Sequence, residues 1–132
     1  MPTIREAIAA PSPGLDFAAA FGHHQSPAIR CGGLIFCSGM LAIDPKTGER
    51  QHGTVTSECR RVFENLKLLL EAAGSSLERI VQVHALIYDR IEYDVLNRIY
   101  RQYVPNGPPC RTVWSVQIEA GLKVQLDVIA AA

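Results

Sequence analysis

Hydrophobic positions recur with a helical period in the middle of the chain. From residue 57 to residue 73 apolar side chains are spaced at i, i+3, i+4, i+7, i+10, i+11 and i+14, which predicts one amphipathic helix. Thr56 or Ser57 can cap the start of this helix, and Gly74 can close its end. A second helical pattern runs over 91–104. The stripe of the first helix consists of Cys59, Val62, Phe63, Leu66, Leu69, Leu70 and Ala73.

Shorter apolar runs flank the two predicted helices. Residues 28–30 and 34–37 are separated by two glycines, which is typical of a β-hairpin. Residues 80–88 are rich in β-formers and predict a central strand. The last 22 residues alternate between apolar and polar positions over 111–118 and 122–129, with a three-residue loop between the runs. We therefore expect a second hairpin at the end of the chain.

The expected register of this terminal hairpin divides its side chains between two faces. If Ile118 opposes Leu122, then Ser115 faces Gln125, and alternation along each strand fixes all other positions. The apolar set, expected in the core, is Trp114, Val116, Val124 and Leu126. The polar set, expected on the face without helices, is Arg111, Ser115, Lys123, Gln125 and Asp127.

The predicted element order is β-β-α-β-α-β-β, an α+β fold in which two helices pack on one face of a mixed sheet. The other face then needs a partner, for which a second subunit is the natural candidate. The 132 residues suggest a single domain, with 26–130 as its core. Residues 1–25 carry a proline-rich loop signal and a small apolar patch, and we expect an N-terminal arm or edge segment there.

Composition narrows the functional classes. Thirteen basic residues balance thirteen acidic ones, so the chain lacks the basic excess of a nucleic-acid binder, and a net charge near zero favours self-association. No apolar run approaches the roughly 20 residues of a membrane span, and the N-terminus lacks a secretory signal pattern, so we expect a cytoplasmic protein. The four cysteines are scattered and predict reduced thiols rather than disulfides or a metal site.

Six stretches of the chain, taken together and in order, resemble the Rid family of reactive intermediate deaminases, also called the YjgF or L-PSP endoribonuclease-like family. The resemblance extends over about 26–130 and includes the alternating last strand. The stretches are SPAI (26–29), GLIFCSG (33–39), IDPKTGE (43–49), ENLKLLLEAAGSS (64–76), VLNRIY (95–100) and PPCRTV (108–113).

The resemblance implies a chorismate-mutase-like fold and a homotrimer with three ligand clefts between neighbouring subunits. It also implies an activity: water attacks the C=N carbon of a 2-imino acid, the tautomer of an enamine, and yields a 2-keto acid and ammonia. No metal or cofactor is needed for this reaction. The expected partners are thus a small 2-imino or 2-keto acid and further copies of the chain, with no membrane and no nucleic acid.

Four family positions are matched directly. The arginine that binds the substrate carboxylate falls on Arg111, where a guanidinium can form two parallel hydrogen bonds. The glycine that lines the cleft falls on Gly39, and the backbone of Val113 shapes the cleft. The asparagine of the family's N-x-x-Y pattern falls on Asn97, with Tyr100. From the pattern alone, however, an arginine in this position is more often an ordinary surface residue that pairs with an acid or extends over the sheet.

Two positions depart from the family pattern. Gln25 stands where the family has a tyrosine, and Gln125 where it has a glutamate on the last strand. A glutamine can orient water but cannot exchange a proton, which removes a contribution of roughly 10²–10⁴-fold. Asp127, on the same face, or His24 on the arm could relay the proton instead. The alternatives are that Asp127 pairs with Lys123 and that His24 is simply solvated.

Geometry and the lost glutamate leave several possibilities open. In the expected hairpin Arg111 and Gln125 are roughly 13 Å apart along the strands, at about 3.3 Å per residue. One small acid could touch both only if Arg111 extends, if a bulge shifts the register, or if the site uses two subunits.

The leading hypothesis is a cofactor-independent imine deaminase. The alternative is a non-catalytic binder of small carboxylates, and RNA cleavage is the least supported function.

Overall fold

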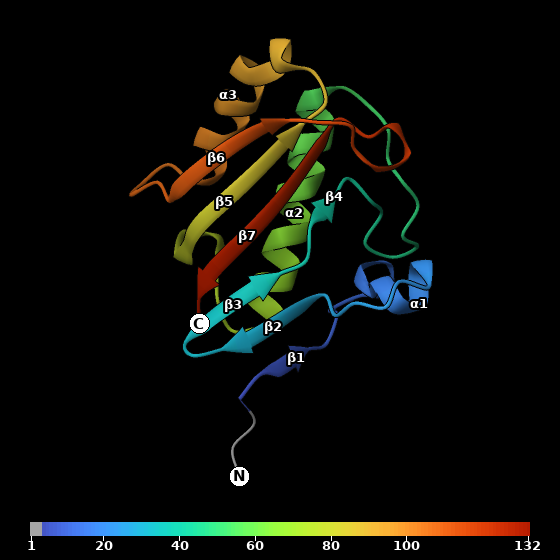
Figure 1. Cartoon of the computed structure of the whole chain (residues 1–132), viewed down its shortest axis with the longest axis vertical. Coiled ribbons are helices and arrows are strands. Elements are labelled where there is room, and N and C mark those ends of the chain that lie inside the picture. Colours follow the sequence, from blue (N-terminus) through green and yellow to red (C-terminus); the bar gives the residue numbers. More distant parts are fainter. Residues whose placement is uncertain (1–3) are drawn as a thin grey trace.

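The computed structural model describes residues 4–132, which form one mixed sheet with helices against it (Figure 1). The strand order is β1-β2-β3-β7-β5-β6, and β4 pairs with β7 beside this path. The strands are β1 (Glu6–Ile8), β2 (Ala28–Cys31), β3 (Leu34–Cys37), β4 (Met40–Leu41), β5 (Ile80–Ile87), β6 (Cys110–Ser115) and β7 (Val124–Ala131). The α-helices are α1 (Phe17–Phe21), α2 (Val55–Ala72) and α3 (Tyr93–Tyr103). The expected α+β class and the β2–β3 hairpin are confirmed.

The predicted terminal hairpin is wrong, because β5 lies between β6 and β7. Strand β6 pairs with β5 in parallel, whereas β7 pairs with β5 antiparallel. Ser115 lies level with Ile87, which in turn lies level with Val124. Two alternating runs joined by a short loop resemble a hairpin in sequence, yet alternation does not say which strand lies next to which. The apolar strand β5, in which Ile87 is buried, lies between the two runs. Both backbone edges of β5 are therefore paired, one with β6 and the other with β7.

The inserted strand splits the predicted polar face in two. Residues level with one another in a sheet project to the same side. Arg111 is level with Val83 and Val128, which are buried beneath the helices. Gln125 and Asp127 alternate with buried positions of β7 and therefore project to the opposite side. Arg111 is thus on the helix-covered face of the sheet, and the two β7 side chains are on the open face.

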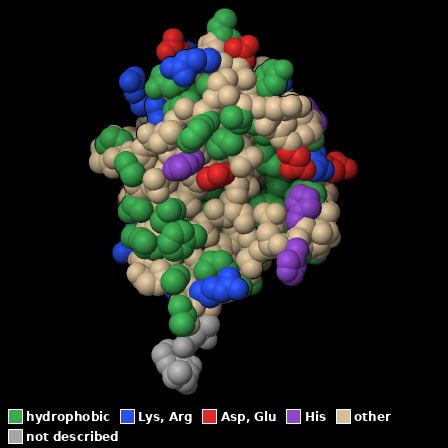
Figure 2. Space-filling model, in the orientation of Figure 1, with side chains coloured by type: hydrophobic (Ala, Val, Ile, Leu, Met, Phe, Trp, Pro, Cys, Tyr) green, Lys and Arg blue, Asp and Glu red, His purple; other side chains and the backbone are tan. Residues whose placement is uncertain are grey.

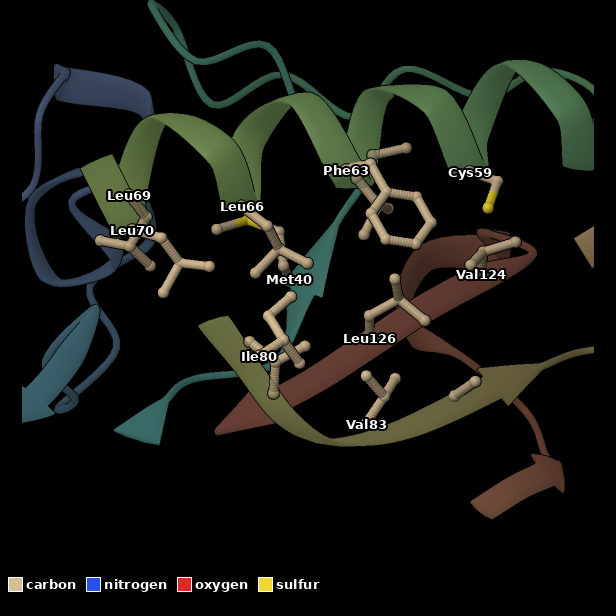
Figure 3. Packing of buried hydrophobic residues seen from close by; sticks show 14 of the residues in the cluster. Met40, Cys59, Phe63, Leu66, Leu69, Leu70, Ile80, Val83, Val124 and Leu126 are labelled. Atoms are coloured by element: carbon tan, nitrogen blue, oxygen red, sulfur yellow. The ribbon is translucent and has the colours of Figure 1, made fainter. Parts of the chain in front are cut away.

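The core lies between α2 and the sheet. In Figure 3 the apolar stripe of α2, from Cys59 to Leu70, faces Val83, Val124 and Leu126 of the central strands. Burying a side chain of this size contributes about 1.5–3 kcal/mol. The helix begins earlier than expected: the side chain of Thr54, rather than Thr56 or Ser57, is the cap and accepts from the Ser57 N–H at 3.1 Å. The closing role of Gly74 is borne out by its left-handed φ of 81°.

The N-terminal segment is more than an arm. Strand β1 pairs antiparallel with β2 at the edge of the sheet, while Leu15 and Phe17 are buried. Gly14 permits this packing, since a Cβ there would lie 2.2 Å from the backbone oxygen of Asp44. The expectation of an edge segment therefore holds for β1, but the expectation that this stretch stays out of the core is wrong. The first three residues of the predicted arm lie outside the described residues.

The second face of the sheet is not covered by any helix within residues 4–132. Figure 1 shows α2 behind the sheet, and Figure 2 looks at the open face, where hydrophobic side chains are visible. Phe36 is 41% exposed and Trp114 is 51% exposed. Trp114, level with Leu86 of β5, thus belongs to this open face and not to the predicted core. Among the described residues, no helix combines the length and the apolar character that crossing a membrane requires.

Candidate active site

Arg111 is held in place by aromatic side chains and has no acidic partner. Its Nη2 donates to the hydroxyl of Tyr93 at 3.2 Å, and its Cζ lies 4.7 Å from the ring centroid of Tyr100. The side chain is half-buried, and within residues 4–132 no carboxylate lies within ion-pair distance of it. A guanidinium held over an aromatic ring is attracted by the ring's negative face, but its hydrogen-bonding edge stays available. The arrangement is suited to binding an anion.

Helix α3 and the proline loop before β6 build the surroundings of Arg111. Tyr93 and Tyr100 are seven residues apart and so lie on one face of α3. A cavity of about 400 Å³ opens here, lined by Tyr93, Asn97, Tyr100, Arg101, Pro108, Pro109 and Arg111. The structure thus brings Asn97 and Arg111 together, as expected. Val113 follows two residues after Arg111 on the same face of β6 but does not line the cavity.

Tyr100 combines burial with a free hydroxyl. Burial raises the pKa of this phenol, while the nearby Arg111 charge opposes the shift. The hydroxyl therefore stays protonated at neutral pH. It has no hydrogen-bond partner among the described residues, although it is shielded from solvent. Guanidinium, amide and phenol groups thus surround the cavity, and all of them can donate hydrogen bonds to a carboxylate.

A second polar group lies on the open face, at the junction of β4 and β7. The Nε2 of Gln125 donates to Oδ1 of Asp127 at 2.9 Å. Gly39 faces this pair, since a Cβ at Gly39 would lie 2.3 Å from the Gln125 Nε2. His84 of β5 is level with Asp127 on the neighbouring strand. Three predicted residues, Gly39, Gln125 and Asp127, are therefore brought together, and the alternative that Asp127 pairs with Lys123 is wrong.

Gln25 and His24 lie in an adjoining cavity of about 590 Å³, the side chains of both being exposed. Phe36 and Cys37 of β3 line this cavity and also the smaller hollow that contains Asp127 and His84. The two hollows are therefore neighbours on the open face. No described contact joins His24 to Asp127, so a proton relay between them stays a prediction.

Within one chain, Arg111 and Gln125 cannot both contact the same small molecule. Two strand spacings of about 4.8 Å and three residues of about 3.3 Å put the Cα atoms of Arg111 and Gln125 roughly 14 Å apart. The side chains also project from opposite faces of the sheet. The bulge in β5, between Ile80 and Gln82, leaves this division unchanged. We call the cavity beside Arg111 the arginine half-site and the cluster of Gly39, Gln125 and Asp127 the glutamine half-site.

Two neighbours of these half-sites have no motif that marks them in the sequence. Tyr93 belongs to the helical pattern over 91–104, and its hydroxyl accepts directly from Arg111. His84 lies in the largely apolar run of β5, outside any motif. The seven-residue spacing of Tyr93 from Tyr100 was the available signal for the first. For His84 only the pairing of β5 with β7 brings the imidazole beside Asp127.

The sequence of this chain was compared with protein families and with individual relatives. The sequence profile of the family described as endoribonuclease L-PSP matches residues 17–132. The chain belongs to this family, also known as Rid or YjgF. A RutC family protein of Pyrococcus horikoshii is 34% identical over 106 residues, which are 80% of this chain and 84% of that protein. The 2-iminobutanoate/2-iminopropanoate deaminase of Mus musculus is 30% identical over 113 residues, 85% of this chain and 83% of the relative.

Solved structures of the L-PSP family share the fold. The Rid family protein YyfA of Yersinia pestis superposes with a TM-score of 0.86 at 27% identity, covering 97% of this chain and 99% of that one. The YjgF gene product of E. coli gives a TM-score of 0.81 at 25% identity, covering 96% and 98%. The predicted family and fold are thus confirmed. A 35% identical relative, Mmf2 of Schizosaccharomyces pombe, is named mitochondrial, and the cytoplasmic location of this chain stays a prediction.

Proposed function

We propose that this L-PSP family protein hydrolyses the C=N bond of small 2-imino acids. The observation that carries the proposal is Arg111, which is oriented by Tyr93 and Tyr100 beside a cavity and is not neutralised by any described carboxylate. Such a cation recognises the carboxylate that all 2-imino acids share. The name of the mouse relative supports the same substrate class.

The active site is completed by a second copy of the chain. One protomer supplies the arginine half-site with Asn97, and its neighbour supplies the glutamine half-site with Gln25. The opposite orientations of Arg111 and Gln125 support this division, because no single chain presents both to one ligand. The apolar open face, the zero net charge and the family resemblance support a homotrimer in which these faces are covered.

The reaction needs neither an oxidant nor a cofactor. Arg111 holds the carboxylate of R–C(=NH₂⁺)–COO⁻, and water held by Gln125 adds to the C=N carbon. A C–O bond forms, the C–N bond breaks, and the two protons of water end on nitrogen. The products are R–CO–COO⁻ and NH₄⁺. Fixing water and imine in one geometry removes much of the entropic part of the barrier.

The second candidate function is binding of small carboxylates without turnover. Gln125 favours it, because an amide does not titrate at neutral pH and cannot take a proton from water. This candidate keeps the arginine half-site and changes only the chemistry opposite to it. Binding and turnover therefore have to be measured separately.

The test uses 2-aminoacrylate or 2-iminobutanoate generated by a PLP-dependent dehydratase, with the decay of the imine followed over time. We expect micromolar protein to accelerate the decay and Arg111→Ala to abolish the acceleration. Arg98→Ala, on the exposed side of α3, is the matched control and should behave as wild type. Calorimetry with a 2-keto acid completes the test. Binding without acceleration supports the carboxylate binder, and the absence of both rejects the two proposals.

A further inference from the structure

The geometry points to Asp127 as a positioning residue that decides which end of the Gln125 side-chain amide faces the ligand. The inference concerns the glutamine half-site and rests on the proposed function for its catalytic meaning. Asp127 does not itself reach the substrate in this scheme. It acts on Gln125, and Gly39 makes room for the contact between the two.

The hydrogen bond between the two side chains has only one possible polarity. An ionised aspartate has acceptors alone, whereas a glutamine amide has two donors on Nε2 and an acceptor at Oε1. Only the Nε2 end can therefore lie 2.9 Å from Oδ1 of Asp127. The Oε1 end of Gln125 is then directed away from Asp127 and is free to accept. Without Asp127 the amide could turn over and present its donors instead.

Gly39 lies directly against the side chains of both Gln125 and Asp127. A Cβ at Gly39 would lie 2.3 Å from Nε2 of Gln125 and 2.8 Å from Oδ1 of Asp127. Real Cβ atoms do not approach other atoms that closely, so any larger residue would push the pair apart. The reason for glycine here is space, because its φ is not in the left-handed region. The backbone of residue 39 thus packs directly against the hydrogen bond that orients the amide.

This orientation lets Gln125 perform one function of a catalytic carboxylate, which is to accept a hydrogen bond, although the amide cannot take up a proton. An oriented Oε1 accepts a hydrogen bond from the attacking water or from the imine N–H, as a carboxylate oxygen would. Oxygen acceptors and nitrogen donors are not interchangeable at such a position, because a flipped amide would donate to the water oxygen and occupy a lone pair that the water needs to attack the C=N carbon. The expected contribution of Asp127 is therefore to turnover, with little effect on binding of the substrate carboxylate at Arg111.

The same geometry predicts an unusual outcome for Gln125→Glu. Two carboxylates at hydrogen-bond distance cannot both ionise easily, and one of them holds a proton to higher pH. Among the described residues, His84 of β5 is the other titratable side chain level with this cluster, and it is kept in all variants. The introduced glutamate should therefore act as a base with a raised pKa only while Asp127 is present.

The first experiment compares two substitutions of one residue in the imine assay. Asp127→Ala removes the acceptor, and we expect kcat to fall at least tenfold while KM changes less than threefold. Asp127→Asn keeps an oxygen acceptor for Nε2, and we expect it to restore kcat to within about threefold of wild type. Glu71→Gln, an exposed acid on α2, is the control for loss of one negative charge. Equal losses in both Asp127 variants would overturn the inference, because the charge and not the orientation would then matter.

The second experiment does not depend on activity. The side-chain amide protons of Gln125, assigned by NMR through their loss in Gln125→Glu, should exchange slowly with solvent in wild type and Asp127→Asn and rapidly in Asp127→Ala. Rapid exchange in wild type would overturn the inference. If the wild type shows slow exchange but no imine hydrolysis, the proposed deaminase function fails while the positioning role of Asp127 stands.

The third comparison is the pH profile of Gln125→Glu with and without Asp127→Asn. We expect the acidic limb of kcat to lie at least one pH unit higher in the single variant than in the double variant. Superimposable profiles would show that the two carboxylates do not interact, against the inference.

Discussion

Arg111 illustrates how single residues define the chemistry of this protein. Its guanidinium lies over the rings of Tyr93 and Tyr100 and donates to the Tyr93 hydroxyl, and its charge stays uncompensated by acids in the described part of the chain. An arginine in such surroundings loses part of its hydration without gaining a counter-ion. A ligand carboxylate would supply that counter-ion. The residue is therefore better explained by binding than by stability.

The buried thiol of Cys59 should make the free energy of unfolding depend on pH in the alkaline range. Burial raises the pKa of its thiol from 9.0 to about 12, so the folded protein keeps this thiol neutral where the unfolded chain ionises it. Its contribution to stability is complete below pH 9 and is lost as pH rises toward 12, by about 1.4 kcal/mol per pH unit. We expect Cys59→Ala to lower the free energy of unfolding by about 1 kcal/mol at pH 7.

Urea unfolding between pH 8 and pH 11 is the measurement. The stability of Cys59→Ala should fall less steeply with pH than that of wild type, so the two curves should cross at about pH 10, above which the variant is the more stable protein. Parallel curves over this range would contradict the buried, neutral thiol.

At the scale of elements, a buried carboxylate connects the start of α2 to the start of β7. Glu58 is fully buried, its Oε1 accepts from the Lys123 backbone N–H at 2.7 Å, and its Oε2 accepts from the Gly53 N–H at 3.2 Å. The Lys123 ammonium lies 3.6 Å from the same carboxylate. Since β7 carries Gln125, this contact helps to place the glutamine half-site relative to the helix layer.

We expect Glu58→Gln to lower the free energy of unfolding by about 2 kcal/mol. The glutamine can accept at one oxygen only, so its NH₂ group would face a backbone N–H donor inside the protein. Urea denaturation monitored by circular dichroism measures the change. Glu64→Gln, on the same helix, is the matched control and should stay within about 0.5 kcal/mol of wild type. A loss equal to that of the control would show that the buried carboxylate is not a structural tie.

At the scale of the whole molecule, the two faces of the sheet differ in what covers them. One face is covered by α2 and α3, whereas the other presents Phe36 and Trp114 to the surroundings. An exposed apolar sheet face is typical of a surface that another protein chain covers. The split between the arginine and glutamine half-sites leads to the same expectation, since their union requires two chains.

Phe36→Asp should convert the proposed homotrimer to monomers, because it would bury an unpaired charge in the subunit interface. Leu68→Asp is the matched control: Leu68 is 40% exposed, like Phe36 at 41%, but lies on α2 away from the open face. Sedimentation at micromolar concentration measures the oligomeric state. Monomeric wild type would contradict the assembly, and dissociation by both variants would show that the effect is not specific to the open face.

Much of the site could be predicted from local patterns. The apolar stripe of α2 and the β2–β3 hairpin depend on neighbours in sequence, and both are found where the pattern placed them, whereas Arg111 lies on the face of the sheet opposite to the expected one. Asn97 could be brought near Arg111 through the family resemblance. The departures at Gln25 and Gln125 are likewise visible without any structure, and they raise the question of how water is activated.

The sequence by itself determined the periodicity of each segment, the class of fold and the chemical types available for catalysis, because these depend on short-range spacing and residue chemistry. Only the tertiary structure decided which strands are neighbours. A run of alternating residues has the same pattern beside any partner, and inserting β5 between β6 and β7 moved Arg111 and Gln125 to opposite faces. The contact of Gln125 with Gly39 depends on the pairing of β4 with β7, and that of Arg111 with Tyr93 depends on the packing of α3 beside β6.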